Sequence, residues 1–173
     1  MCDCCDYIAA RGGRPDDPQL MAEYEAVWRR ATRAMIEDCG CAVVHVEGPS
    51  LPWAYTIGLW PARGHPELVV FGLDRRHAHD LLNALAHSVT QHGDTLADGD
   101  VLELSDDPGD RVALFTVPNP GQVVLRANAY VGRDPAESVS ALQVVYPDDL
   151  GVWPWEPGCR LARGQPMPGS FVA

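Results

Sequence analysis

The sequence predicts an α+β fold, with a mostly antiparallel sheet or small barrel flanked by two helices. Two long segments, residues 20–38 and 76–92, carry apolar residues at helical spacing. Several short segments rich in β-branched and aromatic residues are typical of strands. The expected order is helix, three strands, helix and four strands, which differs from the regular alternation of a parallel α/β sheet.

The first half of the chain contains one helix and three strands. Residues 20–38 place their apolar side chains on one helical face, and Gly40 follows where a left-handed cap would end the helix. Strands are expected at residues 41–46, 54–59 and 67–73, separated by glycine and proline. The third strand, ELVVFGL, is almost continuously apolar, which favours burial on both faces.

The second half begins with a helix at residues 76–92, which Asp74 can cap and Gly93 can end. The remaining strands are expected at residues 101–104, 112–117, 122–128 and 141–146. Residues 1–18 are interpreted as an irregular Cys-rich lead-in, and residues 147–173 as an irregular Trp- and Pro-rich tail. The whole chain, residues 1–173, is therefore expected to form a single domain.

Composition limits the classes of partner. The formal net charge is −11, and a field of that sign repels nucleic acid and anionic membranes, so neither is expected as a partner. The chain has no apolar stretch of membrane-spanning length, and its first residues lack the features of a secretory signal. A cytoplasmic location is therefore expected. All 13 basic residues are arginine, which, with the abundant alanine, glycine and proline, suggests a GC-rich bacterial genome.

Cysteines are concentrated in two short motifs. Cys2 and Cys5 form a C-x-x-C pair, and Cys39 and Cys41 form a C-x-C pair after the first helix. Paired thiols in a reducing compartment are typical of tetrahedral zinc sites. The sequence therefore suggests one zinc ion held by these four thiolates. Reactive thiols and purely structural cysteines are the open alternatives.

The segment GHPEL places His65 and Glu67 at the entry to the buried strand. A histidine and a carboxylate near a strand end can act as general base and general acid, and Tyr55 on the preceding strand could reach the same cleft. These three residues are the catalytic candidates. The structural alternative is that the proline shapes a turn while His65 binds a loop carbonyl and Glu67 faces an arginine.

A second set of candidates concerns a cofactor. The pattern YTIGL, turn, PELVVFGL and helix is loosely similar to the flavin reductase-like split barrel. In such a fold Thr56 could line a flavin site, and Arg75 and Arg76 could meet a phosphate at the helix N-terminus. The alternative is that the two arginines are a solvated basic pair.

Several segments together resemble one bacterial family. They are MCDCCD, CGCAVVHVEG, WAYTIGL, GHPELVVFGL, HDLLNALA and LQVVYPDDLGVWPWEPG. In this order they are similar to the bacterial domain-of-unknown-function 4262 family. Cys39-Gly40-Cys41 departs from the His-Gly-Trp that members often carry. The resemblance covers nearly the whole chain but implies no activity.

Two functions remain open at this stage. The favoured one is an accessory or binding protein with a zinc- or thiol-based N-terminal site and an interaction surface around Trp153 and Trp155, acting as a homodimer or with a protein partner. The alternative is a flavin- or nucleotide-binding oxidoreductase with a split-barrel-like fold. Zinc is favoured over flavin as a cofactor. P-loop, G-x-G-x-x-G, G-x-S-x-G and H-E-x-x-H motifs are missing from the sequence, which argues against several enzyme classes.

Overall fold

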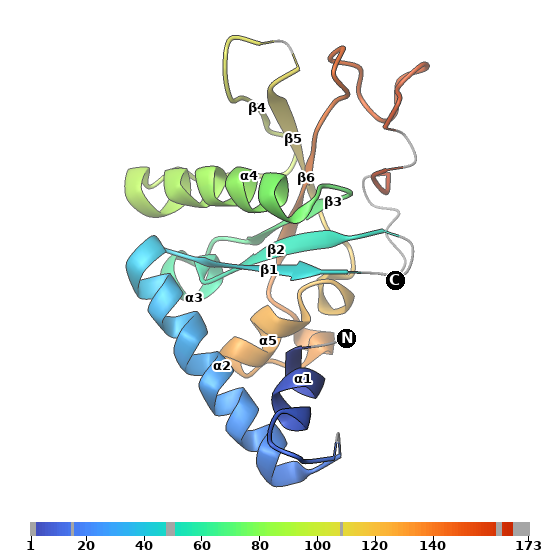
Figure 1. Cartoon of the computed structure of the whole chain (residues 1–173). Helices are drawn as coiled ribbons and strands as arrows, with labels where there is room; N and C mark the ends of the chain where they lie inside the picture. The colour runs from blue at the N-terminus through green and yellow to red at the C-terminus, as the bar shows by residue number, and fades with distance from the viewer. Residues whose placement is uncertain (1–2, 15, 48–50, 108, 162–163, 168–173) are drawn as a thin grey trace.

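The computed structural model confirms the α+β class (Figure 1). It describes residues 3–14, 16–47, 51–107, 109–161 and 164–167. The α-helices in these ranges are α1 (Asp3–Ala9), α2 (Pro18–Cys39), α3 (Leu59–Arg63), α4 (Arg75–His87) and α5 (Leu125–Val131). The strands are β1 (Ala42–Val46), β2 (Trp53–Ile57), β3 (Glu67–Phe71), β4 (Val101–Glu103), β5 (Arg111–Thr116) and β6 (Ala141–Val145).

The strands form one open sheet in the order β1-β2-β3-β6-β5-β4. Neighbouring strands are antiparallel except β3 and β6, which run parallel. The small barrel that the sequence left open is wrong, because β1 and β4 lie at opposite edges of the sheet and do not pair with each other. Both edges therefore present unpaired backbone groups.

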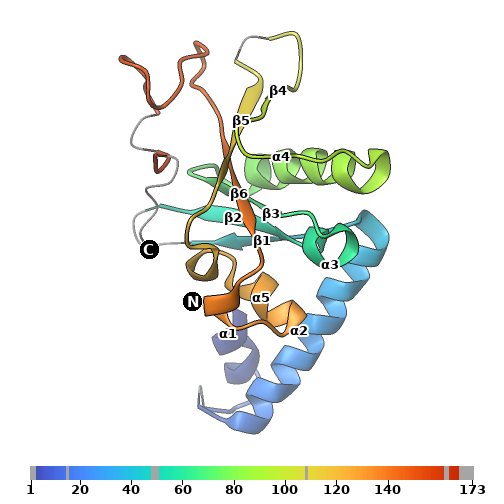
Figure 2. The ribbon, with the colours of Figure 1, turned by 180° about the vertical axis from the view of Figure 1, so that it is seen from behind.

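Helices cover both faces of the sheet, as Figures 1 and 2 show from opposite sides. On one face, Leu82 and Leu85 of α4 pack against Leu68 of β3 and Val144 of β6. On the other face, α2 and α5 cover side chains that include Tyr55. Burial on both faces explains the nearly continuous apolar sequence of β3.

The predicted strand at residues 122–128 is wrong, because this segment is helical. It forms the 3₁₀ helix η2 (Pro120–Gln122) and then α5. Its buried apolar residues are Val123, Val124 and Ala127, a helical spacing that lets one side of the segment pack under the sheet. Tertiary packing therefore outweighs the strand preference of the two valines.

Two further helices lie where irregular chain was expected. The lead-in contains α1, whose Tyr7 ring contacts Tyr24 of α2 at a centroid distance of 5.4 Å. The connection WPARGHP contains the single-turn helix α3, which ends at Gly64 in a left-handed conformation. The second long helix also extends beyond α4, through a π-helical turn η1 (Ser88–His92) to Gly93.

The tail is irregular in its described residues, 147–161 and 164–167, as expected. Asp148 organises its first turn by accepting hydrogen bonds from the amides of Leu150, Val152 and Arg160. Trp153 packs against Ala113 of β5 and its neighbours and so covers one end of the sheet.

Candidate functional site

Glu67 lies at the start of β3 and is buried, with 1% of its surface exposed. Its carboxylate accepts a hydrogen bond from the Thr56 hydroxyl at 2.7 Å and from the amides of Gly58 and Trp60 at 3.0 and 3.1 Å. The two amides belong to the N-terminal end of α3, whose cap residue has no side chain to bind them. Glu67 therefore acts as the cap of α3 from the start of the next strand, β3.

Burial raises the pKa of Glu67 to about 7, and this effect outweighs the hydrogen-bond donors, which lower it. Thr56 completes the arrangement, since its hydroxyl also accepts a hydrogen bond from the Leu68 amide at 2.9 Å. The carboxylate has its donors inside the protein and faces no open cleft.

His65 is also buried, and backbone groups occupy both of its ring nitrogens. Nε2 accepts a hydrogen bond from the Leu96 amide at 3.0 Å, which assigns the proton to Nδ1, 2.7 Å from the Pro66 carbonyl. Burial lowers the pKa of His65, so the neutral ring is favoured. The histidine thereby fastens the loop that carries Leu96 to the entry of β3.

Tyr55 packs on the sheet face covered by α2 and α5. Its hydroxyl accepts a hydrogen bond from the Arg126 amide at 3.1 Å, and burial raises the pKa of the phenol to about 12. The three catalytic candidates therefore have separate partners, each within the protein interior.

The residues predicted to bind a cofactor occupy different environments. Thr56 is fully buried, whereas Arg75 and Arg76 are exposed at the start of α4. Arg75 lies 3.8 Å from Glu47, and Arg76 lies 3.8 Å from Asp80 on the next helical turn. Both arginines lie near exposed carboxylates, and phosphate binding at this end of α4 stays a prediction.

The two cysteine motifs lie at different places along α2. Cys5 lies on α1, which contacts the first half of α2 at Tyr24. Cys39 is the last residue of α2, and at a rise of 1.5 Å per residue it lies about 22 Å beyond Tyr24. Zinc–sulfur bonds are only about 2.3 Å long, so these thiols cannot share an ion. Cys2 lies outside the described residues.

The buried Cys41 has a structural environment. Its sulfur lies 3.6 Å from the Asn83 side-chain oxygen, and burial raises the pKa of the thiol to about 12. Across the described part of the chain, no three His, Cys, Asp or Glu side chains lie close enough to hold a metal ion.

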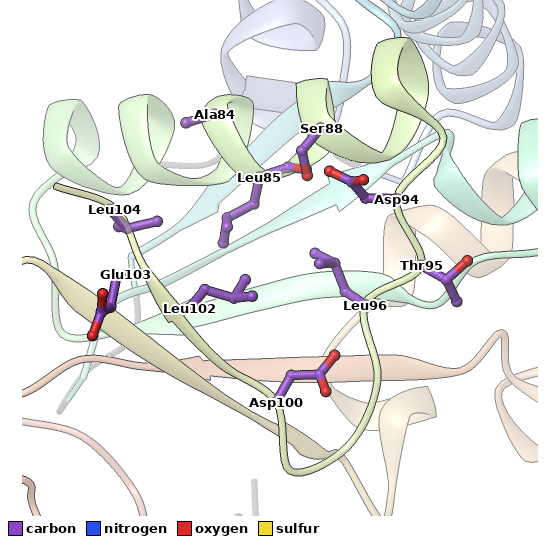
Figure 3. Close-up of a pocket in the computed structure, with 10 residues that line it drawn as sticks. All are labelled: Ala84, Leu85, Ser88, Asp94, Thr95, Leu96, Asp100, Leu102, Glu103 and Leu104. Atoms are coloured by element: carbon purple, nitrogen blue, oxygen red, sulfur yellow. The ribbon is translucent and has the colours of Figure 1, made fainter.

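An open groove of about 420 Å³ lies between α4 and the edge strand β4 (Figure 3). Leu85 extends from α4 towards Leu102 of β4, and Leu96 lies beside them on the loop that leads to β4. Asp94 and Asp100 add carboxylates to this apolar lining. The remaining lining residues are Ala84, Ser88, Thr95, Glu103 and Leu104.

The groove follows from the position of α4 on the sheet. The helix packs mainly against β1, β2 and β3, while β4 lies at the far edge. The chain between η1 and β4 bridges the two, held by the bond between His65 and Leu96. Part of the apolar lining therefore stays open: Leu104, directly after β4, is 39% exposed.

The chain around the groove is strongly acidic. Residues 94–110 contain no arginine, lysine or histidine. They contain seven carboxylates, which are Asp94, Asp98, Asp100, Glu103, Asp106, Asp107 and Asp110. None of these seven forms a salt bridge with a described residue. The region therefore carries seven formal negative charges, although Arg111 of β5 lies opposite Glu103 in the sheet.

The sequence predicts a strand here but no site. The available signal was the alternation of acidic and apolar residues in DGDVLELSDD, residues 98–107. Such alternation is also typical of an ordinary half-buried strand. The groove exists only because β4 lies at the sheet edge, beyond α4.

Together these features define an α+β protein with an open mixed sheet, helices on both faces and an acidic apolar groove at one edge. A family model described as a domain of unknown function (DUF4262) matches residues 35–160, and the chain belongs to this family. Searches of curated proteins and of solved structures found no match. No helix within the described ranges is long and apolar enough to cross a membrane.

Proposed function

We propose that this protein is a non-catalytic accessory protein that binds a basic, apolar segment of a partner protein in the groove between α4 and β4. The observation that carries the proposal is the combination of an open apolar groove with carboxylates that have no ion-pair partner in the described chain. Exposed apolar surface favours association, and uncompensated charge selects a partner of opposite charge.

The hydrogen bonds of the three catalytic candidates support a binding role. Glu67, His65 and Tyr55 each use their polar atoms to hold the fold together. The proposal does not include a zinc ion shared by the two cysteine motifs, since Cys5 lies on α1 and Cys39 at the far end of α2. It places the protein in the bacterial cytosol, where the exposed thiol of Cys39 would stay reduced.

A synthetic hexapeptide of alternating arginine and valine is a direct probe. We expect the labelled peptide to bind, and we expect the triple variant Asp94→Asn, Glu103→Gln, Asp106→Asn to bind about tenfold more weakly, because three attractive charges are lost. Fluorescence anisotropy at near-physiological salt measures both affinities.

Two controls make this test specific. The matched triple variant Asp6→Asn, Glu23→Gln, Glu137→Gln removes the same charge from exposed sites on α1, α2 and the 3₁₀ helix η3 (Pro135–Glu137), and it should change affinity less than about twofold. A glutamate–valine peptide should not bind. Equal weakening by the two triple variants, or no binding of the arginine–valine peptide, would contradict the proposed function.

A further inference from the structure

The hydrogen bonds of β4 show which of its backbone groups face outward. The Leu104 amide donates to the Asp110 carbonyl at 2.8 Å, and the Leu114 amide donates to the Asp100 carbonyl at 2.9 Å. Hydrogen-bonded residues alternate along an antiparallel strand, so Leu102 also faces β5. The amides and carbonyls of Val101 and Glu103 therefore point to the open side of β4.

The side chains of β4 alternate in the same way. Leu102 lies opposite Val112 and packs on the face covered by α4, so it enters the groove. Val101 lies opposite Ala113, on the face that Trp153 covers. The open edge of β4 thus has the groove on one side and an exposed valine beside Glu103 on the other.

From this geometry we infer that the basic partner segment binds as an additional strand on the open edge of β4. This inference rests on the proposed function. Outward amides and carbonyls of Val101 and Glu103 give the segment its main-chain hydrogen bonds. Its apolar side chains enter the groove beside Leu102, and its basic side chains alternate to the other face, beside Glu103.

Charge selects this occupant over a second copy of the chain. Pairing of two β4 edges would bring together two sets of seven carboxylates, and like charges in close contact are unfavourable. A basic strand meets the same carboxylates as attractive partners. Asp106 lies shortly after β4, so it can contact one end of an added strand.

Methylation of peptide nitrogens tests strand addition directly. One version of the arginine–valine peptide carries N-methyl groups on all arginine amides and the other on all valine amides. Only one of these two sets of amides can face β4, because alternate residues of a strand point their amides to opposite sides. We expect one methylated peptide to lose at least tenfold in affinity and the other to stay within about threefold of the parent.

Which of the two methylated peptides loses affinity also shows whether the added strand runs antiparallel or parallel to β4. In antiparallel pairing, the peptide residues whose amides face β4 place their side chains on the same face as Val101. These residues are the arginines, so methylation of the arginine amides should weaken binding. In parallel pairing, methylation of the valine amides should weaken binding instead. Equal affinity of both methylated peptides, or equal loss by both, would overturn strand addition.

A protein variant gives an independent measurement. Val101→Pro removes an outward amide without removing a bond between β4 and β5, because edge strands tolerate proline at such positions. With folding verified by circular dichroism, it should weaken binding of the unmodified peptide at least tenfold, while Val101→Ala stays within about threefold. Dimer formation in place of peptide binding would contradict both proposals, whereas binding unaffected by methylation would leave the proposed function standing alone.

Discussion

His65 and Glu67 are neighbours in sequence but stabilise different parts of the molecule. Glu67 caps α3, and His65 fastens the loop at Leu96 that forms one wall of the groove. Both residues were candidates for acid–base chemistry. Their hydrogen bonds to backbone groups give them structural roles, since a buried amide or carboxyl group without a partner would be costly.

We expect His65→Ala to lower the free energy of unfolding by about 2 kcal/mol near neutral pH, because it leaves the buried Leu96 amide without its acceptor. The pKa of His65 is lowered in the folded protein, so the unfolded chain binds a proton first as pH falls. The stabilisation by His65 is therefore complete above about pH 6.5 and is lost as pH falls from there towards the folded-state pKa.

Urea unfolding of both proteins at about pH 7.5 and about pH 5 measures this difference. The comparison with His65→Ala is needed because Glu67, with its pKa raised to about 7, contributes a pH dependence of opposite sign in both proteins. His92→Ala, at an exposed position, is the control and should change little at either pH. A loss from His65→Ala that is equal at both pH values would show that protonation of His65 is not coupled to folding.

Individual elements depend on close backbone approaches as well as on side chains. The helices η2 and η3 meet at Gly121, where an added Cβ would lie 2.0 Å from the Pro135 carbonyl oxygen. This contact holds the segment before α5 in place and so favours a helix where the sequence predicts a strand.

Gly121→Ala should destabilise the protein by about 3 kcal/mol, because backbone atoms on both sides must move. Gly132→Ala is the matched control: it has a φ of +72° but no atom within 4 Å of an added Cβ, so only the backbone conformation contributes, at about 1 kcal/mol. Chemical denaturation of both variants gives the two values. Equal costs would mean that the contact between η2 and η3 does not constrain the fold.

At the scale of the whole molecule, charge is unevenly distributed. Seven carboxylates lie in residues 94–110, beside a groove whose floor is apolar. Their mutual repulsion opposes folding, and a bound basic segment would relieve it. The same arrangement that destabilises the free protein therefore favours association with a partner.

Screening this repulsion should stabilise the free protein. We expect the melting temperature to rise by about 3 °C between about 20 mM and about 200 mM sodium chloride, as the screening length shortens. The triple variant Asp94→Asn, Glu103→Gln, Asp106→Asn should show a smaller rise, measured by differential scanning calorimetry. If the variant and the parent respond equally to salt, the repulsion does not originate in this region.

Local sequence patterns were enough to predict the α+β class, both long helices, most strands, the family and the acidic character. Helical spacing identified α2 and α4, and short β-branched segments identified strands such as β1 and β3, because burial of one face imposes these local patterns. The sequence also singled out His65 and Glu67. The structural alternative agrees with the contact between His65 and the Pro66 carbonyl. It is wrong for Glu67, which binds Thr56 and backbone amides instead of an arginine.

The remaining features depend on the tertiary structure. It decided that the sheet stays open, that Val123 and Val124 precede a helix, and that Glu67 caps α3 across the chain. It also placed β4 at an edge that α4 leaves open. Each of these depends on contacts between different elements, and local periodicity carries no information about which elements meet.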